Sequence, residues 1–219
     1  MELKGKKIAF LGDSITEGVG VSSLEKVYWN LVGQRTGAEV YGYGVGGTRI
    51  AVNHLPGKDA YIDANWFGAR VEGMIPDADV VVVFGGTNDF GHGDAPFGTP
   101  KDRTGDTFYG AYHALMQQLI HRYPYAQLIV MTPLHRIGEE MMPFNEAGVR
   151  RAGILKQYVQ IIREVAEFYS VPVVDLFAES GLQPRVQLLK EMYMPDGLHP
   201  NDAGHIKIAN CLLRVLERL

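Results

Sequence analysis

The sequence predicts a three-layer α/β/α fold, in which helices cover both faces of a five-stranded parallel sheet. Short β-branched runs alternate with longer segments whose apolar residues recur every three or four positions. Strand–helix alternation of this kind is typical of a parallel sheet between helices, as in flavodoxin-like folds. The runs VVVVF and LIVM are continuously apolar, which indicates strands that are covered on both faces.

The same patterns place each element. Strands are expected at 6–12, 38–43, 79–86, 126–133 and 171–177, and helices near 25–36, 59–75, 107–123, 145–170 and 201–219. The third helix carries an apolar stripe and is stopped by Pro124. No repeat, linker or composition break divides the chain, so residues 1–219 are expected to form a single domain. The Gly-, Pro- and Asp-rich segment 91–107 is expected to be a functional or disordered loop.

Composition excludes several classes of protein. The net charge of −4 and the absence of a Lys/Arg cluster argue against nucleic-acid binding. The single cysteine, Cys211, excludes an intrachain disulfide and lies in an apolar pattern typical of a core thiol. No leader-like segment and no apolar run long enough for a bilayer is present. A cytoplasmic location without membrane contact is therefore expected, and the oligomeric state is left open.

Ligands of an open parallel sheet bind beyond the carboxyl ends of its strands. The loops there read GDSITEG, GVGGTR, GGTNDFGHG and TPLHR. Ser14, in the first loop, is a candidate nucleophile, although a serine before a helical turn is also a common N-cap. The G-x-S-x-G elbow of α/β-hydrolases is not met, because Ile15 and Thr16 follow Ser14.

The next two loops offer hydrogen-bond donors. A dinucleotide-binding fingerprint is matched by Gly42, Gly44 and Gly47, but no helix follows directly. The better interpretation is a tight loop whose backbone approaches a ligand and offers the N–H of Gly47 as a donor. A turn that merely needs a positive φ is equally compatible with the pattern. Asn88, after the most apolar strand, either caps the next element or directs its amide into the cleft.

The motif Asp-x-x-His occurs three times, and the spacing alone does not select one copy. The copies are Asp89/His92, Asp196/His199 and Asp202/His205. Prolines bracket the second pair, which keeps it out of regular structure, whereas Asn201 or Asp202 is expected to cap the last helix. His205 is then expected to be a surface or packing residue. Asp89 and His92 follow a strand and remain a rival pair.

Taken together, GDSIT, GVGGT, GTND and DGLHP resemble, in order, the blocks of the SGNH hydrolases, also called the GDSL esterase/lipase family. The resemblance implies Ser14 as nucleophile, His199 as base and Asp196 as its orienting carboxylate. It implies an oxyanion hole from the N–H groups of Ser14 and Gly47 and the Asn88 amide. Ester hydrolysis through an acyl-serine follows, with no metal or organic cofactor.

The substrate is expected to be a small ester, with a short-chain or acetyl carbohydrate ester preferred and a lysophospholipid or thioester as the alternative. A non-catalytic phosphate- or flavin-binding module is an alternative of another class, although Asp13 and Glu17 disfavour an anion there. A metal site of His92, Asp94 and His135 lacks the usual ligand spacing. Candidate pocket residues, which could equally be loop packing, are Phe90, His92, Phe97, His135 and Met194.

Overall fold

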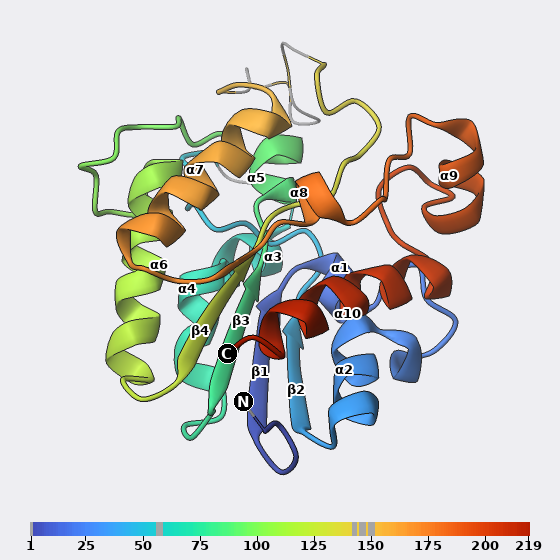
Figure 1. Ribbon diagram of the computed structural model, residues 1–219. Helices are drawn as coiled ribbons and strands as arrows, with labels where there is room; N and C mark the ends of the chain where they lie inside the picture. The colour runs from blue at the N-terminus through green and yellow to red at the C-terminus, as the bar shows by residue number, and fades with distance from the viewer. Residues whose placement is uncertain (1, 56–58, 142–143, 145–147, 149–151) are drawn as a thin grey trace.

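The computed structural model describes residues 2–55, 59–141, 144, 148 and 152–219. Five parallel strands form one sheet in the order β2-β1-β3-β4-β5, and Figure 1 shows β2, β1, β3 and β4 side by side. The strands are β1 (Lys7–Gly12), β2 (Glu39–Gly44), β3 (Val80–Phe84), β4 (Gln127–Met131) and β5 (Val173–Val174). Four of them lie within the segments that the sequence predicts, and β2 extends one residue beyond the predicted segment 38–43, to Gly44. The alternation of apolar runs with helical segments therefore predicts the three-layer fold correctly.

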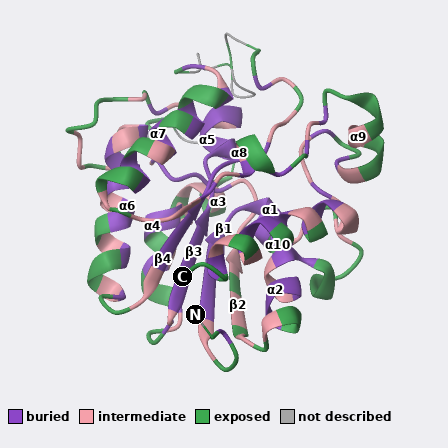
Figure 2. Ribbon diagram, viewed as in Figure 1, coloured by how far each residue is buried: buried purple, intermediate pink, exposed green. Residues whose placement is uncertain are grey.

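Helices cover the two faces of this sheet. One face packs against α4 (Phe67–Arg70), α6 (Phe108–Arg122) and α7 (Leu155–Phe168). The other packs against α1 (Ser14–Glu17), α2 (Tyr28–Thr36) and α10 (Asp202–Leu216). Figure 2 shows β1, β3 and β4 buried between these layers, and every residue of β3 is inaccessible to solvent or nearly so. The continuous apolar run of β3 is explained by this two-sided burial.

The carboxyl ends of the central strands meet at one edge. Gly12, the last residue of β1, is level with Gly44 of β2 and with Phe84 of β3. The connection after β1 leads to β2 on one side, and the chain then returns to place β3 on the other side. This reversal of strand order between β1 and β3 is where open α/β sheets bind their ligands.

Several short elements differ from the predicted ones. The single helix expected over 59–75 is broken into α3 (Ala60–Ala64), α4 and the 3₁₀ turn η2 (Val71–Gly73), because Trp66 adopts an extended backbone. The helix expected from 145 begins at Leu155, and part of 145–151 lies outside the described residues. The short helices α5 (Thr87–His92), α8 (Leu176–Glu179) and α9 (Gln187–Tyr193) and the 3₁₀ turn η1 (Leu24–Lys26) complete the described elements.

The segment 91–107 starts at the end of α5 and contains no helix or strand between Gly93 and Thr107. It is held by hydrogen bonds: Asp94 accepts the N–H groups of His54 and Leu55, and Asp102 accepts N–H and O–H groups of Thr99. A Thr107 side-chain cap then starts α6. The loop is thus anchored at both ends by carboxylates.

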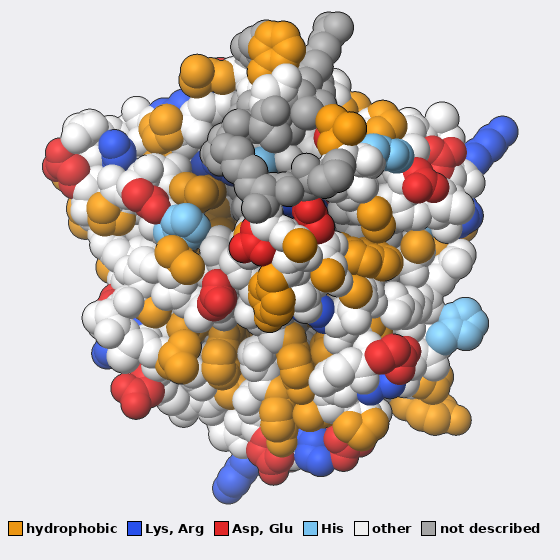
Figure 3. Space-filling view, turned by 180° about the vertical axis from the view of Figure 1, so that it is seen from behind, with side chains coloured by type: hydrophobic (Ala, Val, Ile, Leu, Met, Phe, Trp, Pro, Cys, Tyr) orange, Lys and Arg blue, Asp and Glu red, His pale blue; other side chains and the backbone are white. Residues whose placement is uncertain are grey.

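The surface is mixed in character. Figure 3, which views the molecule from behind, shows Lys and Arg side chains scattered singly among acidic and apolar ones. Within the described ranges, the structure has no helix whose length and apolar character would allow it to cross a bilayer.

Candidate active site

Ser14 stands directly beyond β1, as the first residue of α1. The N-cap is Asp13 rather than Ser14, because the Asp13 carboxylate accepts the N–H of Ile15 at 3.0 Å. The Ser14 side chain is thereby released from capping, and Ser14 is buried, with 8% of its surface exposed. Gly12 permits this turn, since a Cβ there would lie 1.9 Å from Oγ1 of Thr16. The capping alternative for Ser14 is therefore wrong.

His199 lies against this serine. Oγ of Ser14 and Nε2 of His199 are 3.0 Å apart, and Nδ1 of His199 lies 2.6 Å from a carboxylate oxygen of Asp196. The other Asp196 oxygen accepts the N–H groups of Leu198 and His199 at 2.8 and 2.7 Å. The chain thus brings a hydroxyl, an imidazole and a carboxylate into one line of hydrogen bonds.

The negative charge of Asp196 determines which ring nitrogen of His199 carries the proton. Burial acts to raise the pKa of Asp196, but the N–H groups of Leu198 and His199 and the His199 ring outweigh it, so the pKa lies below its ordinary value. An ionised carboxylate only accepts hydrogen bonds, so Nδ1 of His199 carries the proton. Nε2 is then an acceptor for the Ser14 hydroxyl, which is the geometry of a general base with its nucleophile.

Two backbone contacts hold the Asp196–His199 loop in place. The Ile137 N–H donates to the carbonyl of Gly197 at 2.8 Å, and the Asn201 N–H donates to the carbonyl of Tyr193 at 2.8 Å. Gly197 has a φ of +80°, and a Cβ there would lie 2.4 Å from the Ile137 side chain. The loop after β4 therefore buttresses the loop that carries His199.

Of the predicted oxyanion donors, Gly47 belongs to a loop that lies beside Ser14. The ideal Cβ position of Gly46 is 3.7 Å from Cβ of Ser14, and Gly47 follows with a φ of +75°. Asn88 lies in α5 after β3, and its amide donates to the carbonyl of Thr48 at 3.0 Å. Within the described chain, the N–H groups of Ser14 and Gly47 have no acceptor. Among the described residues these two N–H groups are therefore unoccupied, whereas one N–H of the Asn88 amide is engaged by Thr48.

The rival pair Asp89 and His92 serves another purpose. The Asp89 carboxylate accepts the N–H groups of Ile50 and Ala51 at 2.9 to 3.2 Å, and Nδ1 of His92 accepts from Arg49 at 2.8 Å. Burial raises the pKa of Asp89 to about 6. The pair therefore fastens the segment after Gly47 to α5, which fixes the position of the loop that carries Gly47 relative to the helix that carries Asn88.

The third pair is also structural. Asp202 accepts the backbone N–H and the hydroxyl of Ser22, while Asn201 caps α10. His205 is fully buried and stacks on Tyr28, and its Nδ1 accepts the Tyr28 N–H at 3.1 Å. That contact supplies a cap for α2, whose N-cap residue offers no side-chain acceptor. Burial lowers the pKa of His205 to about 4.

The predicted pocket residues fall into different settings. Phe90 and Met194 are almost fully buried in the two cores, so they follow the packing alternative. Phe97 packs its ring on Tyr158, with centroids 4.8 Å apart. His135 is partly exposed and donates to the Glu139 carboxylate at 2.9 Å. Its ring contacts the Phe177 ring at an interplanar angle of 35°.

Sequence reasoning missed Arg70, which lies beneath the site. Its guanidinium donates to the carbonyls of Gly12 and Tyr43 and to the hydroxyl of Thr48. It therefore ties the end of β1, the end of β2 and the Gly47 loop together. Burial lowers the pKa of Arg70 to about 10, and burial raises that of the nearby Asp13 to about 6. No local signal marks Arg70, because its acceptors come from separate segments.

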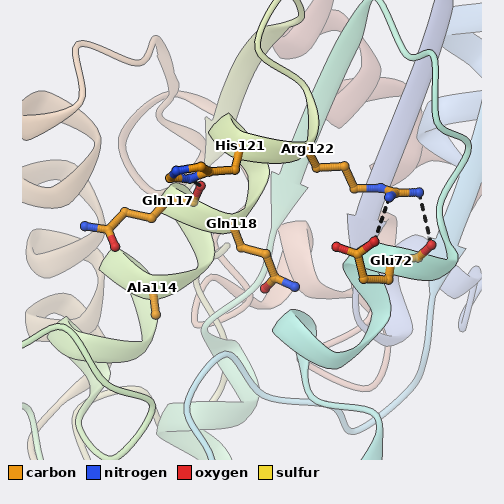
Figure 4. Close-up of a pocket in the computed structure, with 6 residues that line it drawn as sticks. All are labelled: Glu72, Ala114, Gln117, Gln118, His121 and Arg122. Carbon is orange, nitrogen blue, oxygen red and sulfur yellow. Dashed lines mark hydrogen bonds and ion pairs between the residues drawn. The ribbon is translucent and has the colours of Figure 1, made fainter.

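Other candidate sites lie elsewhere. A pocket of about 520 Å³ on the outer side of α6 is shown in Figure 4, and an Arg122–Glu72 ion pair closes one end of it. None of the predicted site residues lines this pocket. Across the described residues, no group of three or more His, Cys, Asp or Glu side chains is placed to bind a metal ion.

Comparison with known proteins decides the family. The sequence pattern described as the GDSL-like lipase/acylhydrolase family matches residues 10–206. The chain belongs to the GDSL-like lipase/acylhydrolase family. Its GDSL relatives include a lipase of Mycobacterium tuberculosis, 28% identical over 93% of this chain and 78% of that protein. An acetylxylan esterase of Geobacillus stearothermophilus is 26% identical over 96% of this chain and 93% of that protein.

The GDSL fold is also found among solved structures. A protein from Lactobacillus plantarum superimposes with a TM-score of 0.80 at 28% identity, and 98% of each chain is covered. The family resemblance seen in the sequence blocks is thus confirmed. This GDSL protein is a carboxylic ester hydrolase, and the phosphate- or flavin-binding module is not favoured.

Proposed function

We propose that this esterase removes short acyl groups, with acetyl preferred, from small polyhydroxylated alcohols through an acyl-enzyme on Ser14. One observation carries the proposal: Oγ of Ser14 lies 3.0 Å from Nε2 of His199, whose Nδ1 is engaged by Asp196 at 2.6 Å. Serine, imidazole and carboxylate in this order are the requirements of nucleophilic acyl transfer.

The chemistry follows from the proton positions. His199 accepts the Ser14 proton as Oγ attacks the acyl carbonyl, and Asp196 stabilises the resulting imidazolium. The imidazolium then donates this proton to the departing alkoxide, which leaves the acyl group on Ser14. Water, deprotonated by His199, attacks the acyl-serine, and return of the proton to Oγ releases the acid and restores the serine.

The negative charge of each tetrahedral intermediate needs fixed donors. We assign this role to the N–H groups of Ser14 and Gly47 and to the second N–H of the Asn88 amide. The first N–H of Asn88 is held by the carbonyl of Thr48 at 3.0 Å, so its amide cannot rotate freely. A donor held in place before the reaction contributes about 3 kcal/mol to transition-state stabilisation.

The preference for acetyl carbohydrate esters is supported by the acetylxylan esterase relative, which is similar over almost the entire length of both proteins. Lysophospholipase or thioesterase activity is the alternative within the same mechanism. A cytoplasmic location belongs to the same proposal, and its support is the presence of one cysteine, Cys211, which is buried.

Hydrolysis of p-nitrophenyl acetate by the purified protein tests the mechanism. Turnover is expected for the unchanged enzyme and is expected to vanish in Ser14→Ala and in His199→Ala. His121→Ala is the matched control, because His121 is an exposed histidine on α6 in the separate pocket. A fluorophosphonate that adds its mass to Ser14 would identify the nucleophile directly.

The remaining outcomes separate the alternatives. Loss of activity in His92→Ala together with full activity in His199→Ala would overturn the assignment of the base. Esters of p-nitrophenol with acetyl, butyryl and octanoyl groups rank the acyl preference, and the rate is expected to fall as the chain lengthens. A higher kcat/KM for octanoyl than for acetyl would contradict the short-chain assignment.

A further inference from the structure

Glu17 is an acidic side chain at the candidate active site to which the proposed mechanism gives no task. It is the last residue of α1, the turn that begins with Ser14. Its side chain is exposed, whereas Ile15 and Thr16 of the same turn are buried. Glu17 therefore projects outward from the turn that carries the nucleophile.

The position of the Glu17 carboxylate follows from the neighbouring glycine. A Cβ built on Gly46 would lie 2.7 Å from Oε2 of Glu17 and 3.7 Å from Cβ of Ser14. Oε2 of Glu17 and Cβ of Ser14 thus lie on the same side of Gly46. The distance between these two atoms cannot exceed the sum of the two distances given above. Gly47, the proposed oxyanion donor, is the next residue along this loop.

Glycines create the space for this arrangement. At Gly44, a Cβ would lie 2.1 Å from the backbone nitrogen of Glu17, so the end of β2 packs directly on the backbone of α1. At Gly46, a Cβ would come within 2.7 Å of Oε2 of Glu17, so a larger residue there would displace the Glu17 carboxylate from its present position. The absence of a side chain at Gly46 therefore leaves room for the carboxylate beside Ser14.

The Glu17 carboxylate has no hydrogen-bond or ion-pair partner among the residues that the structure describes. The other acids at this edge are all engaged: Asp13 caps α1, Asp89 accepts two backbone N–H groups, and Asp196 holds His199. Glu17 thus differs from them in offering both carboxylate oxygens to solvent or to a bound molecule.

The helix α3, which contacts this loop, carries an exposed aromatic residue. In α3, the Ile62 side chain comes within 2.9 Å of the ideal Cβ position of Gly47, and the preceding Tyr61 is 64% exposed. Burial lowers the pKa of Arg70, while Asp13, Tyr61 and Glu17 act to raise it. Tyr61 and Glu17 are therefore both within electrostatic reach of the guanidinium beneath the site.

We propose that Glu17 is a specificity-determining residue that accepts hydrogen bonds from the hydroxyl groups of the substrate's alcohol and excludes alcohols that carry a phosphate. This inference rests on the proposed esterase function and adds the residue that selects the leaving group. An ionised carboxylate has acceptor sites on two oxygens and no donor, so it matches neighbouring hydroxyls of a neutral polyol and repels an anion.

The expected effects are measurable. Replacement of Glu17 by glutamine leaves one acceptor oxygen and removes the charge. Loss of a hydrogen bond to a charged group lowers kcat/KM for a neutral polyol ester by about tenfold. Removal of one exposed negative charge several ångströms from a phosphate raises kcat/KM for a phosphorylated ester by about threefold to tenfold. The second effect shrinks as salt is added, because salt screens exposed charges.

Two substrates that differ only in the phosphate provide the test. These are 1-acetylglycerol and 1-acetylglycerol 3-phosphate, with p-nitrophenyl acetate as a reference ester whose alcohol has no hydroxyl neighbours. The unchanged enzyme is expected to prefer 1-acetylglycerol. In Glu17→Gln, the ratio of kcat/KM for the neutral ester to that for the phosphorylated ester is expected to fall by about thirtyfold or more.

The matched control is Glu167→Gln, which makes the same charge change at an exposed position in the last turn of α7, a helix that packs on the other face of the sheet from α1. Its substrate ratio is expected to equal that of the unchanged enzyme. Thermal unfolding of both variants checks that they are folded. The same ratio in Glu17→Gln and the unchanged enzyme would overturn the assignment of Glu17. Absence of Ser14-dependent hydrolysis of all three esters would instead overturn the proposed function.

Discussion

Replacement of His205 by glutamine is predicted to remove a defined part of the pH dependence of stability. The His205 ring is fully buried and accepts the Tyr28 N–H through Nδ1, so its proton is on Nε2, for which the described residues provide no partner. A second proton would have to bind Nδ1 and would break the hydrogen bond from the Tyr28 N–H. Burial accordingly lowers the pKa of His205 from 6.5 to about 4.

The sign and size of the effect follow from proton linkage. Above pH 6.5 the ring is neutral in both the folded and the unfolded chain, and its contribution to stability is fully present. As the pH falls, the unfolded chain takes up the proton first, so stability is lost between about pH 6.5 and pH 4. From pH 7 to pH 5 the loss amounts to about 2 kcal/mol of unfolding free energy.

Two buried carboxyl groups act in the opposite direction. Burial raises the pKa values of Asp13 and Asp89 to about 6, so the folded chain takes up these protons first and gains stability as the pH falls from about 6 toward 4. The unchanged protein alone therefore does not isolate the histidine. The difference between its unfolding free energy and that of His205→Gln does, because both proteins retain the two carboxyl groups.

Urea unfolding at a series of pH values, followed by tryptophan fluorescence, measures this difference. The advantage of the unchanged protein is expected to shrink by about 2 kcal/mol from pH 7 to pH 5. His121→Gln, at an exposed position, is expected to follow the unchanged protein at every pH. A difference that stays constant over this range, or an NMR titration of His205 with a midpoint near 6.5, would refute the reasoning.

Three further predictions concern the active site. In Asp196→Asn, the new amide donates to Nδ1 of His199, so the His199 proton is expected to lie on Nε2. The value of kcat/KM should then fall about ten-thousandfold. Thermal unfolding is expected to show an intact fold. Asn88→Ala is expected to lower kcat about a hundred- to a thousandfold with a smaller change in KM; an unchanged kcat would remove Asn88 from the oxyanion hole. Gly44→Ala is expected to destabilise the protein by about 2 kcal/mol or more in urea unfolding, because the new Cβ would lie 2.1 Å from a backbone nitrogen. Gly73→Ala is the control and should leave the unfolding free energy unchanged, because a Cβ at Gly73 meets nothing within 4 Å.

The parts of the fold that sequence predicts are those with a periodic apolar signal. The strands β3 and β4 are buried on both faces, and their unbroken apolar runs indicate this burial from the sequence alone. The sequence does not predict helix α9, because this helix has no buried residue and hence no one-sided apolar stripe. The sequence predicts one helix over 59–75, whereas the extended backbone at Trp66 divides this region. Local sequence does not reveal that break, because it is imposed by packing.

The candidate site shows the same limit. The sequence blocks place Ser14, Asn88 and His199 at the sheet edge because each follows a recognisable strand or precedes a capped helix. They do not reveal Arg70, whose contacts join segments far apart in the chain. Nor do they reveal that His205 caps α2 across 177 positions. Such roles depend on the three-dimensional neighbours of a residue rather than on its own motif.

The hydrogen bond between Ser14 and His199 spans 185 positions of the chain. During synthesis the serine leaves the ribosome 185 residues before its imidazole partner. A polypeptide that ends before His199 therefore holds an inert hydroxyl, and hydrolytic activity appears only when both segments have been made and have docked. Appearance of activity thus reports the docking of two distant segments of the chain, which makes a simple chromogenic ester a sensor of its folding.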